Sequence, residues 1–217
     1  MSIACTSLWN LTATEIRSQV ASITPTPGGG SVSVITAILG LALIHKGTSV
    51  SLKRSASDIA RHDSLVDLRM KLASTMESLS RFADEDAAAF QSYVQARSLP
   101  NTTESESDAR RASMNEALLR ATQTPIEAAA EMAQALDLAA TAVDLADAQV
   151  LSDIFAGALL LHASIKAVLL NLDANLPNVQ DAELRDTVKQ RRIELEDASA
   201  LCADAVAHNY RVRVNVS

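Results

Sequence analysis

Aromatic residues are rare in this chain of 217 residues, where Phe, Trp and Tyr together make up only 3%. Basic residues are outnumbered as well, and the formal net charge is −7 at pH 7. Proteins that bind nucleic acids use basic grooves and aromatic stacking platforms, so no nucleic-acid partner is expected. Because glycine is also scarce while alanine, leucine and serine are abundant, the composition favours helices over sheets.

Cysteine and histidine are scarce too, with two and four copies respectively. Cys5 and Cys202 lie far apart and form no CxxC pair, which argues against a disulfide scaffold or a thiolate zinc site. His162 and Lys166 share a helical face, but no second histidine or carboxylate accompanies them at ligand spacing. The sequence therefore predicts no bound metal.

The chain opens without the pattern of a signal peptide, and its apolar runs do not require a membrane. The run 32–44 is too short to span a bilayer, and the run 154–172 is interrupted by His162 and Lys166. Buried helices of a bundle or a dimer explain both runs. A cytoplasmic protein without a membrane partner is expected.

Apolar periodicity predicts a single all-α domain over residues 1–217, a bundle of about seven helices. Thr124 and Pro125, followed by Glu127, resemble an N-cap, a first-turn proline and a capping-box glutamate, and so predict a helix start. Several helices are long and apolar nearly all round, which favours a homodimer that buries a second face. The expected helices cover 12–22, the glycine loop to 47, 57–97, 108–121, 124–145, 152–172 and 182–209.

Three of the six glycines stand in a row in the stretch 24–32. Pro27 fixes its φ angle, while Gly28, Gly29 and Gly30 open conformations that other residues cannot reach. Ser31 is placed to cap the helix that follows, whose exposed N–H groups could bind an anion or a polar ring edge. The alternative is an ordinary helix-entry loop.

Asp86 occupies a position on an apolar helical stripe that runs from Leu65 to Val94. A carboxylate in such a place must be paired or hydrogen-bonded, and desolvation would raise its pKa, as suits a general acid or base. Its neighbours Asp84 and Glu85 point elsewhere and are expected to be solvated. Alternatively, Asp86 has a purely structural role and holds two helices together as a buried, hydrogen-bonded residue.

A second polar set lies on the helix 152–172. Ser152 and Asp153 stand at its start, where such residues often cap, and Asn171 and Asn175 lie one turn apart near its end. Asp153 and Asn171 are 18 residues apart and share a face, but about 27 Å separates them along a helix. Either they serve different purposes, or antiparallel packing in a dimer brings them together.

Several of these segments together resemble the formimidoyltetrahydrofolate cyclodeaminase domain and its bacterial relative, the single-domain methenyltetrahydrofolate cyclohydrolase. The resemblance covers nearly the whole chain. The segments, in family order, are Thr26-Pro27-Gly28-Gly29-Gly30-Ser31, Ala83-Asp84-Glu85-Asp86-Ala87 with Phe90, Leu99-Pro100, Thr124-Pro125, Ser152-Asp153, and Asn171 with Asn175.

The resemblance implies an all-α dimer that acts on the one-carbon unit bridging N5 and N10 of tetrahydrofolate. It implies no cofactor beyond the folate substrate itself. Asp86 would be the acid or base, with Asp153 as a second catalytic carboxylate. The residues implied to bind substrate are Pro27, Gly28, Gly29, Gly30, Ser31, Ser152, Asn171 and Asn175.

The expected reaction is hydrolysis of 5,10-methenyltetrahydrofolate to 10-formyltetrahydrofolate. The alternatives are formimidoyltetrahydrofolate cyclodeamination and a catalytically silent homologue that only binds a ligand. The silent alternative rests on departures from the family pattern: Ser49-Val50-Ser51 replaces Asn-Leu-Thr, Ala146-Asp147 replaces Gly-Asn, and Phe155 replaces a glycine. Phe155 in particular is expected to fill space that a substrate would occupy.

Overall fold

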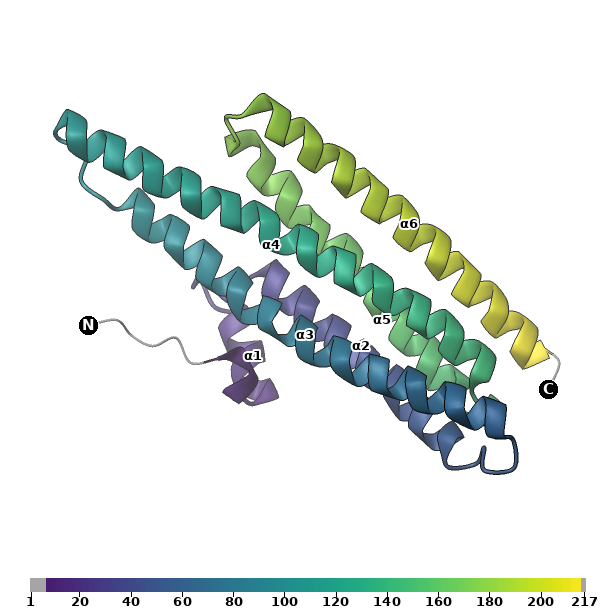
Figure 1. The fold of residues 1–217 in the computed structure, drawn as a ribbon. Coiled ribbons are helices and arrows are strands. Elements are labelled where there is room, and N and C mark those ends of the chain that lie inside the picture. Colours follow the sequence, from purple (N-terminus) through teal and green to yellow (C-terminus); the bar gives the residue numbers. More distant parts are fainter. Residues whose placement is uncertain (1–6, 216–217) are drawn as a thin grey trace.

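The computed structural model describes residues 7–215, and no strand occurs within that range. Its long helices lie roughly alongside one another as a bundle, with the short first helix set apart (Figure 1). Three short 3-10 turns, Leu8–Asn10, Ala148–Val150 and Leu176–Asn178, join or precede them. The α-helices are α1 (Ala13–Val20), α2 (Gly29–Leu52), α3 (Ile59–Arg97), α4 (Glu104–Leu145), α5 (Leu151–Asn175) and α6 (Ala182–Asn215).

The all-α fold class is confirmed, but the described residues form six α-helices rather than about seven. The predicted helix start at Thr124 is wrong, because α4 continues through it and holds Pro125 in its interior. The capping box instead lies at Thr103 and Glu106, where the two side chains bond each other's backbone N–H groups. The connection between α3 and α4, residues 98–103, is therefore shorter than the interval between the expected helices 57–97 and 108–121.

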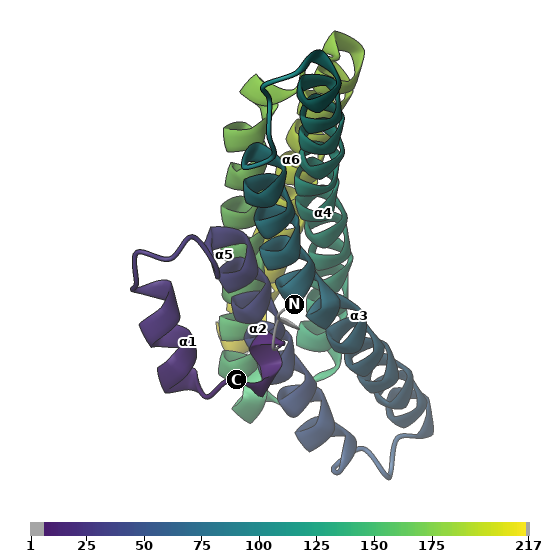
Figure 2. The same ribbon diagram turned by 90° about the vertical axis from the view of Figure 1, so that its left-hand side faces the viewer.

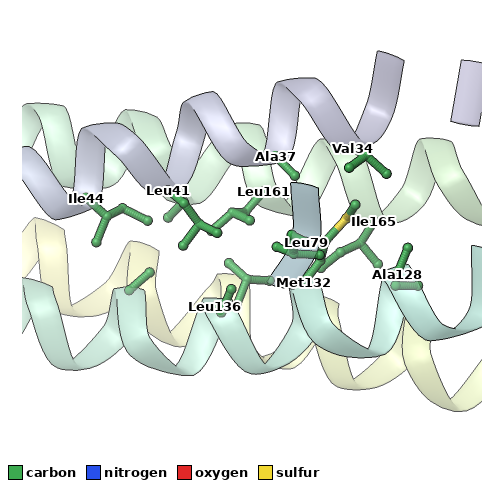
Figure 3. Packing of buried hydrophobic residues seen from close by; sticks show 14 of the residues in the cluster. Val34, Ala37, Leu41, Ile44, Leu79, Ala128, Met132, Leu136, Leu161 and Ile165 are labelled. Carbon is green, nitrogen blue, oxygen red and sulfur yellow. The ribbon is translucent and has the colours of Figure 1, made fainter. Parts of the chain in front are cut away.

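The core is almost entirely aliphatic, in keeping with the shortage of aromatic residues, although it includes the buried ring of Phe82. Helices α2 and α5 cross where Gly40 meets Gly157, and a Cβ atom on either glycine would overlap the other's backbone. Alanines on the buried face of α4, among them Ala128, belong to the same core as the apolar residues of α2 and α5 (Figure 3). The labelled core residues come from four helices: Val34, Ala37, Leu41, Ile44, Leu79, Ala128, Met132, Leu136, Leu161 and Ile165.

Helix α1 projects from the bundle and buries none of its own residues (Figure 2). The turn before it is tied to α3. The Asp84 carboxylate accepts hydrogen bonds from the Ser7 hydroxyl and the Leu8 N–H, and the Trp9 indole donates to the Ser80 carbonyl. Asp84 is therefore an anchor for the N-terminal segment, and the expectation that it is simply solvated is wrong.

Helices α2 and α5 leave an apolar face uncovered. Leu39 on α2 is 59% exposed and Leu159 on α5 is 55% exposed. By length and composition, α2 and the segment Ala148–Asn178 could each cross a membrane, although 44% of each apolar window is buried inside the protein. Core helices of a bundle pass the same test, so this finding alone does not distinguish the two environments.

Candidate active site at the start of helix α2

A cavity of about 230 Å³ opens where the α2 N-terminus meets α3, α4 and the end of α5. Its one ionisable lining residue among the described residues is Asp86. Of the residues predicted to bind substrate, the three glycines of the loop and both asparagines line it, whereas Pro27 and Ser31 do not. The full lining is Pro25, Thr26, Gly28, Gly29, Gly30, Asp86, Ala89, Phe90, Ala121, Thr124, Asn171, Ala174 and Asn175.

Three hydrogen bonds hold the Asp86 carboxylate at the cavity wall. Oδ2 accepts from the Ser31 N–H at 2.8 Å and from the Ser31 hydroxyl at 2.9 Å. Oδ1 accepts from the Asn171 amide at 3.3 Å. Ser31 is fully buried inside the first turn of α2, so it orients Asp86. The prediction that Ser31 caps α2 is wrong, since Gly28 is the N-cap and has no side chain to bond.

Burial raises the pKa of Asp86 above its ordinary value, because desolvation penalises the ionised carboxylate. The hydrogen bonds from Ser31 and Asn171 act in the opposite direction and offset part of that effect. A carboxyl group with a raised pKa exchanges protons closer to neutral pH than an ordinary aspartate does. That property suits a general acid or base.

Gly30 is the glycine that this arrangement requires. A Cβ atom at position 30 would overlap both the Asp86 carboxylate and the Asn171 amide. A Cβ atom at Gly29 would meet nothing closer than the Asn171 Oδ1, at 4.0 Å. No described glycine has a positive φ angle, so the expected need for unusual backbone conformations is wrong; close approach is the reason instead.

Asn175 is hydrogen-bonded to α4 at the turn that Pro125 interrupts. Pro125 has no N–H group, so the carbonyl of Ala121, four residues earlier, lacks its usual helical donor. The Asn175 Nδ2 donates to that carbonyl at 2.8 Å. Since one side of the amide is occupied in this way, Asn175 fixes the end of α5 against α4 as well as lining the cavity.

Ser152 and Asp153 lie at the opposite end of α5, outside the cavity. The prediction that they cap the helix is wrong, because Val150 is the N-cap and both residues lie in the first turn. Asp153 accepts from the Lys46 ammonium at 2.8 Å, and these side chains are 37% and 64% exposed. Within the single chain, the two predicted catalytic carboxylates are therefore not brought together.

A sequence model of the family described as formiminotransferase-cyclodeaminase matches residues 12–194. The chain belongs to this family. The resemblance noted from the sequence is thereby confirmed, and with it membership of a family of folate one-carbon enzymes.

Two relatives in this family differ in how much of their length the chain covers. A methenyltetrahydrofolate cyclohydrolase of Methylorubrum extorquens is 29% identical, and the alignment covers 89% of each chain. A formimidoyltransferase-cyclodeaminase of Sus scrofa is 30% identical over 80% of this chain, but the chain spans only 32% of that longer protein.

A solved structure confirms the fold class. A formiminotetrahydrofolate cyclodeaminase from Thermotoga maritima superposes with a TM-score of 0.83, covering 95% of this chain and 98% of that one. At 20% identity this likeness supports the fold alone.

The departures from the family pattern lie away from the cavity. Phe155 does not line it; its ring stacks on Tyr210 of α6 with centroids 4.3 Å apart, so the expectation that it fills substrate space in this cavity is wrong. Two other departures face each other, since the Asp147 N–H donates to the Ser51 hydroxyl at 2.9 Å. The Ser49 Oγ is buried with no hydrogen-bond partner among the described residues.

Several lining residues carried no signal in the sequence. Ala89, Ala121 and Ala174 are alanines in alanine-rich helices, and only the packing of three helices shows that they face one cavity. Phe90 and Thr124 belong to segments that carried the family resemblance, but nothing in the pattern gave them a place in the site. Within residues 7–215, no group of three His, Cys, Asp or Glu side chains is placed to hold a metal ion.

Proposed function

We propose that this protein hydrolyses 5,10-methenyltetrahydrofolate to 10-formyltetrahydrofolate. The observation that carries the proposal is the Asp86 carboxylate, partly buried at a cavity wall and oriented by Ser31 and Asn171. The cyclohydrolase relative, aligned over nearly the full length of both chains, supports this reaction over other folate chemistry.

The chemistry requires little more than a positioned base. The methenyl carbon lies between N5 and N10 in a cationic amidinium and is already electrophilic. Asp86 takes a proton from water as the oxygen attacks that carbon, and the bond from carbon to N5 then breaks as N5 regains a proton. The formyl group stays on N10, and one proton is released overall. A positioned base of this kind contributes about 10²- to 10⁴-fold.

The direct test follows the loss of methenyltetrahydrofolate absorbance with purified protein, against the spontaneous hydrolysis of a protein-free blank. We expect a clear acceleration that depends on Asp86. Absence of acceleration by folded protein would contradict the proposal.

Formimidoyltetrahydrofolate cyclodeamination is the second candidate, because the raised pKa of Asp86 also suits proton delivery to departing ammonia. Release of ammonia from the formimino substrate, without hydrolysis of the methenyl compound, would favour it. A silent homologue is the third candidate, and it predicts neither activity.

The protein acts, in this proposal, as a homodimer in the cytoplasm, with no cofactor beyond the folate and no metal. The cavity of about 230 Å³ is smaller than the roughly 300–1,000 Å³ of sites that enclose a drug-sized ligand, so one protomer does not enclose a folate. A second copy of the chain is the occupant we propose for the uncovered face of α2 and α5, with Leu39 and Leu159 at its centre.

The spacing along α2 supports a composite site. Val32, Leu39 and Lys46 recur every seven residues and so share one helix face. A two-fold axis near Leu39 would place Lys46 and Asp153 of one copy beside the glycine loop of the other. Ser152 and Asp153 would then contribute to the partner's cavity. Light scattering should report a dimer, and Leu39→Lys should produce monomers with reduced activity.

A further inference from the structure

Among the residues that the structure describes, Phe90 is the one aromatic side chain that lines the cavity. Its ring is on α3, one helical turn beyond Asp86, and the residue is 42% exposed. Single exposed apolar residues are common and need no explanation by themselves. Here, however, the exposed ring shares a cavity with the partly buried Asp86 carboxylate, and both groups attract cations.

The other aromatic rings with described contacts are already engaged. Phe155 stacks on Tyr210, the Arg81 guanidinium lies over Phe82, and the Trp9 indole bonds the Ser80 carbonyl. Among the described residues, no ring or cation of the protein stacks on Phe90. Its face is therefore available to a ligand in the cavity.

The geometry favours a planar cation. Residues four apart on a helix have Cβ atoms about 5–6 Å apart, so a flat ring resting on Phe90 has the Asp86 carboxylate at its edge. An aromatic face attracts cations through its quadrupole, and a carboxylate does so through its charge. A neutral ring in the same place gains only the apolar contact.

We propose that Phe90 determines specificity by binding the cationic amidinium ring of the bridged folate against its π face. The inference rests on the proposed function, because it assigns the charged portion of that substrate to a named side chain. Hydrolysis opens the ring and removes its charge, so the same contact weakens once the product has formed. Phe90 therefore distinguishes substrate from product and favours product release.

The test compares a ligand that has a cationic ring with one that lacks it in Phe90→Leu, which keeps apolar bulk but removes the π face. The probes are 5,10-methenyltetrahydrofolate, read by its KM, and 5-formyltetrahydrofolate, a competitor that lacks the amidinium cation, read by its inhibition constant. We expect KM to rise about three- to tenfold while the inhibition constant changes less than twofold. Phe90→Tyr, which restores the ring, should return KM to near the wild-type value.

Val94→Ala provides the matched control, because Val94 is an exposed apolar residue one turn further along α3 and outside the lining. It should change neither constant. Equal weakening of both ligands in Phe90→Leu, or no change in either, would overturn the inference while leaving the hydrolase activity standing. Failure of the wild-type protein to bind or hydrolyse the methenyl compound would instead overturn the proposed function.

Discussion

The two ends of helix α5 carry similar polar residues in different surroundings. At the C-terminal end, Asn171 contacts a carboxylate that is partly buried, triply hydrogen-bonded and raised in pKa. At the N-terminal end, Asp153 forms an exposed ion pair with Lys46. Exposed pairs contribute little to stability and leave both groups free for other partners. The C-terminal end thus lies at a formed cavity within the single chain, whereas the N-terminal end would act in catalysis only if a second molecule bound there.

Replacing Asp86, the carboxylate beside the C-terminal end of α5, should have the largest effect on activity. Asp86→Asn keeps the size of the side chain but removes the base, so kcat for methenyltetrahydrofolate hydrolysis should fall about a hundredfold or more. Near-wild-type turnover would remove Asp86 from the mechanism.

The same variant should not lose stability at pH 7. A raised carboxyl pKa means that the native state favours the protonated form, so the contribution of Asp86 to stability is present at low pH and is lost as pH rises through the folded pKa. Thermal unfolding at pH 7 should therefore give an unchanged or higher Tm for Asp86→Asn. A clearly lower Tm would indicate that the hydrogen bonds to the carboxylate outweigh its desolvation.

The glycine loop allows a matched pair of changes next to that carboxylate. Gly30→Ala should displace the Asp86 and Asn171 side chains and lower kcat about ten- to a hundredfold, since misplacement of about 1 Å can have that effect. Gly29→Ala, where the added methyl group has room, should stay within about twofold of wild type. Similar losses in both variants would show that loop flexibility matters more than the close approach.

Complementation between two variants tests whether Asp153, at the exposed N-terminal end of α5, takes part in catalysis. If Asp153 acts in the partner's cavity, Asp153→Asn alone should lower activity about tenfold. Co-expression with Asp86→Asn should then recover about a quarter of wild-type activity, because half of the dimers are mixed and each has one intact site. No recovery, with mixed dimers present, would confine Asp153 to a surface ion pair.

Ser31 offers the smallest and most specific change. Ser31→Ala removes one hydrogen bond that lowers the pKa of Asp86, while the backbone N–H bond remains. The pKa of Asp86 should rise further, so the acid limb of the pH–rate profile should move to higher pH while the plateau stays nearly unchanged. A lower plateau without displacement of the limb would point to a substrate contact instead.

Periodicity in the sequence was sufficient to predict the fold class, and it singled out Asp86 as a carboxylate on an apolar stripe, which the structure places partly buried at the cavity wall. Its catalytic role stays a prediction. Local signals were less reliable wherever tertiary contacts decide the outcome. Thr124 and Pro125 have the chemistry of a helix start, yet α4 continues through both residues while it packs against α3 and α5. The alanines of the cavity could not be recognised, because the same residue type fills the core.

Pro125 has a consequence for the divergence of the family. By leaving the Ala121 carbonyl without its helical donor, it makes the amide at position 175 necessary, although the two positions are fifty residues apart. A relative that replaces the proline restores the backbone bond and relaxes the requirement for an amide there. We therefore expect a change at position 175 to accompany or follow loss of the proline, because a chain that altered Asn175 alone would leave the Ala121 carbonyl without a donor beside the candidate site.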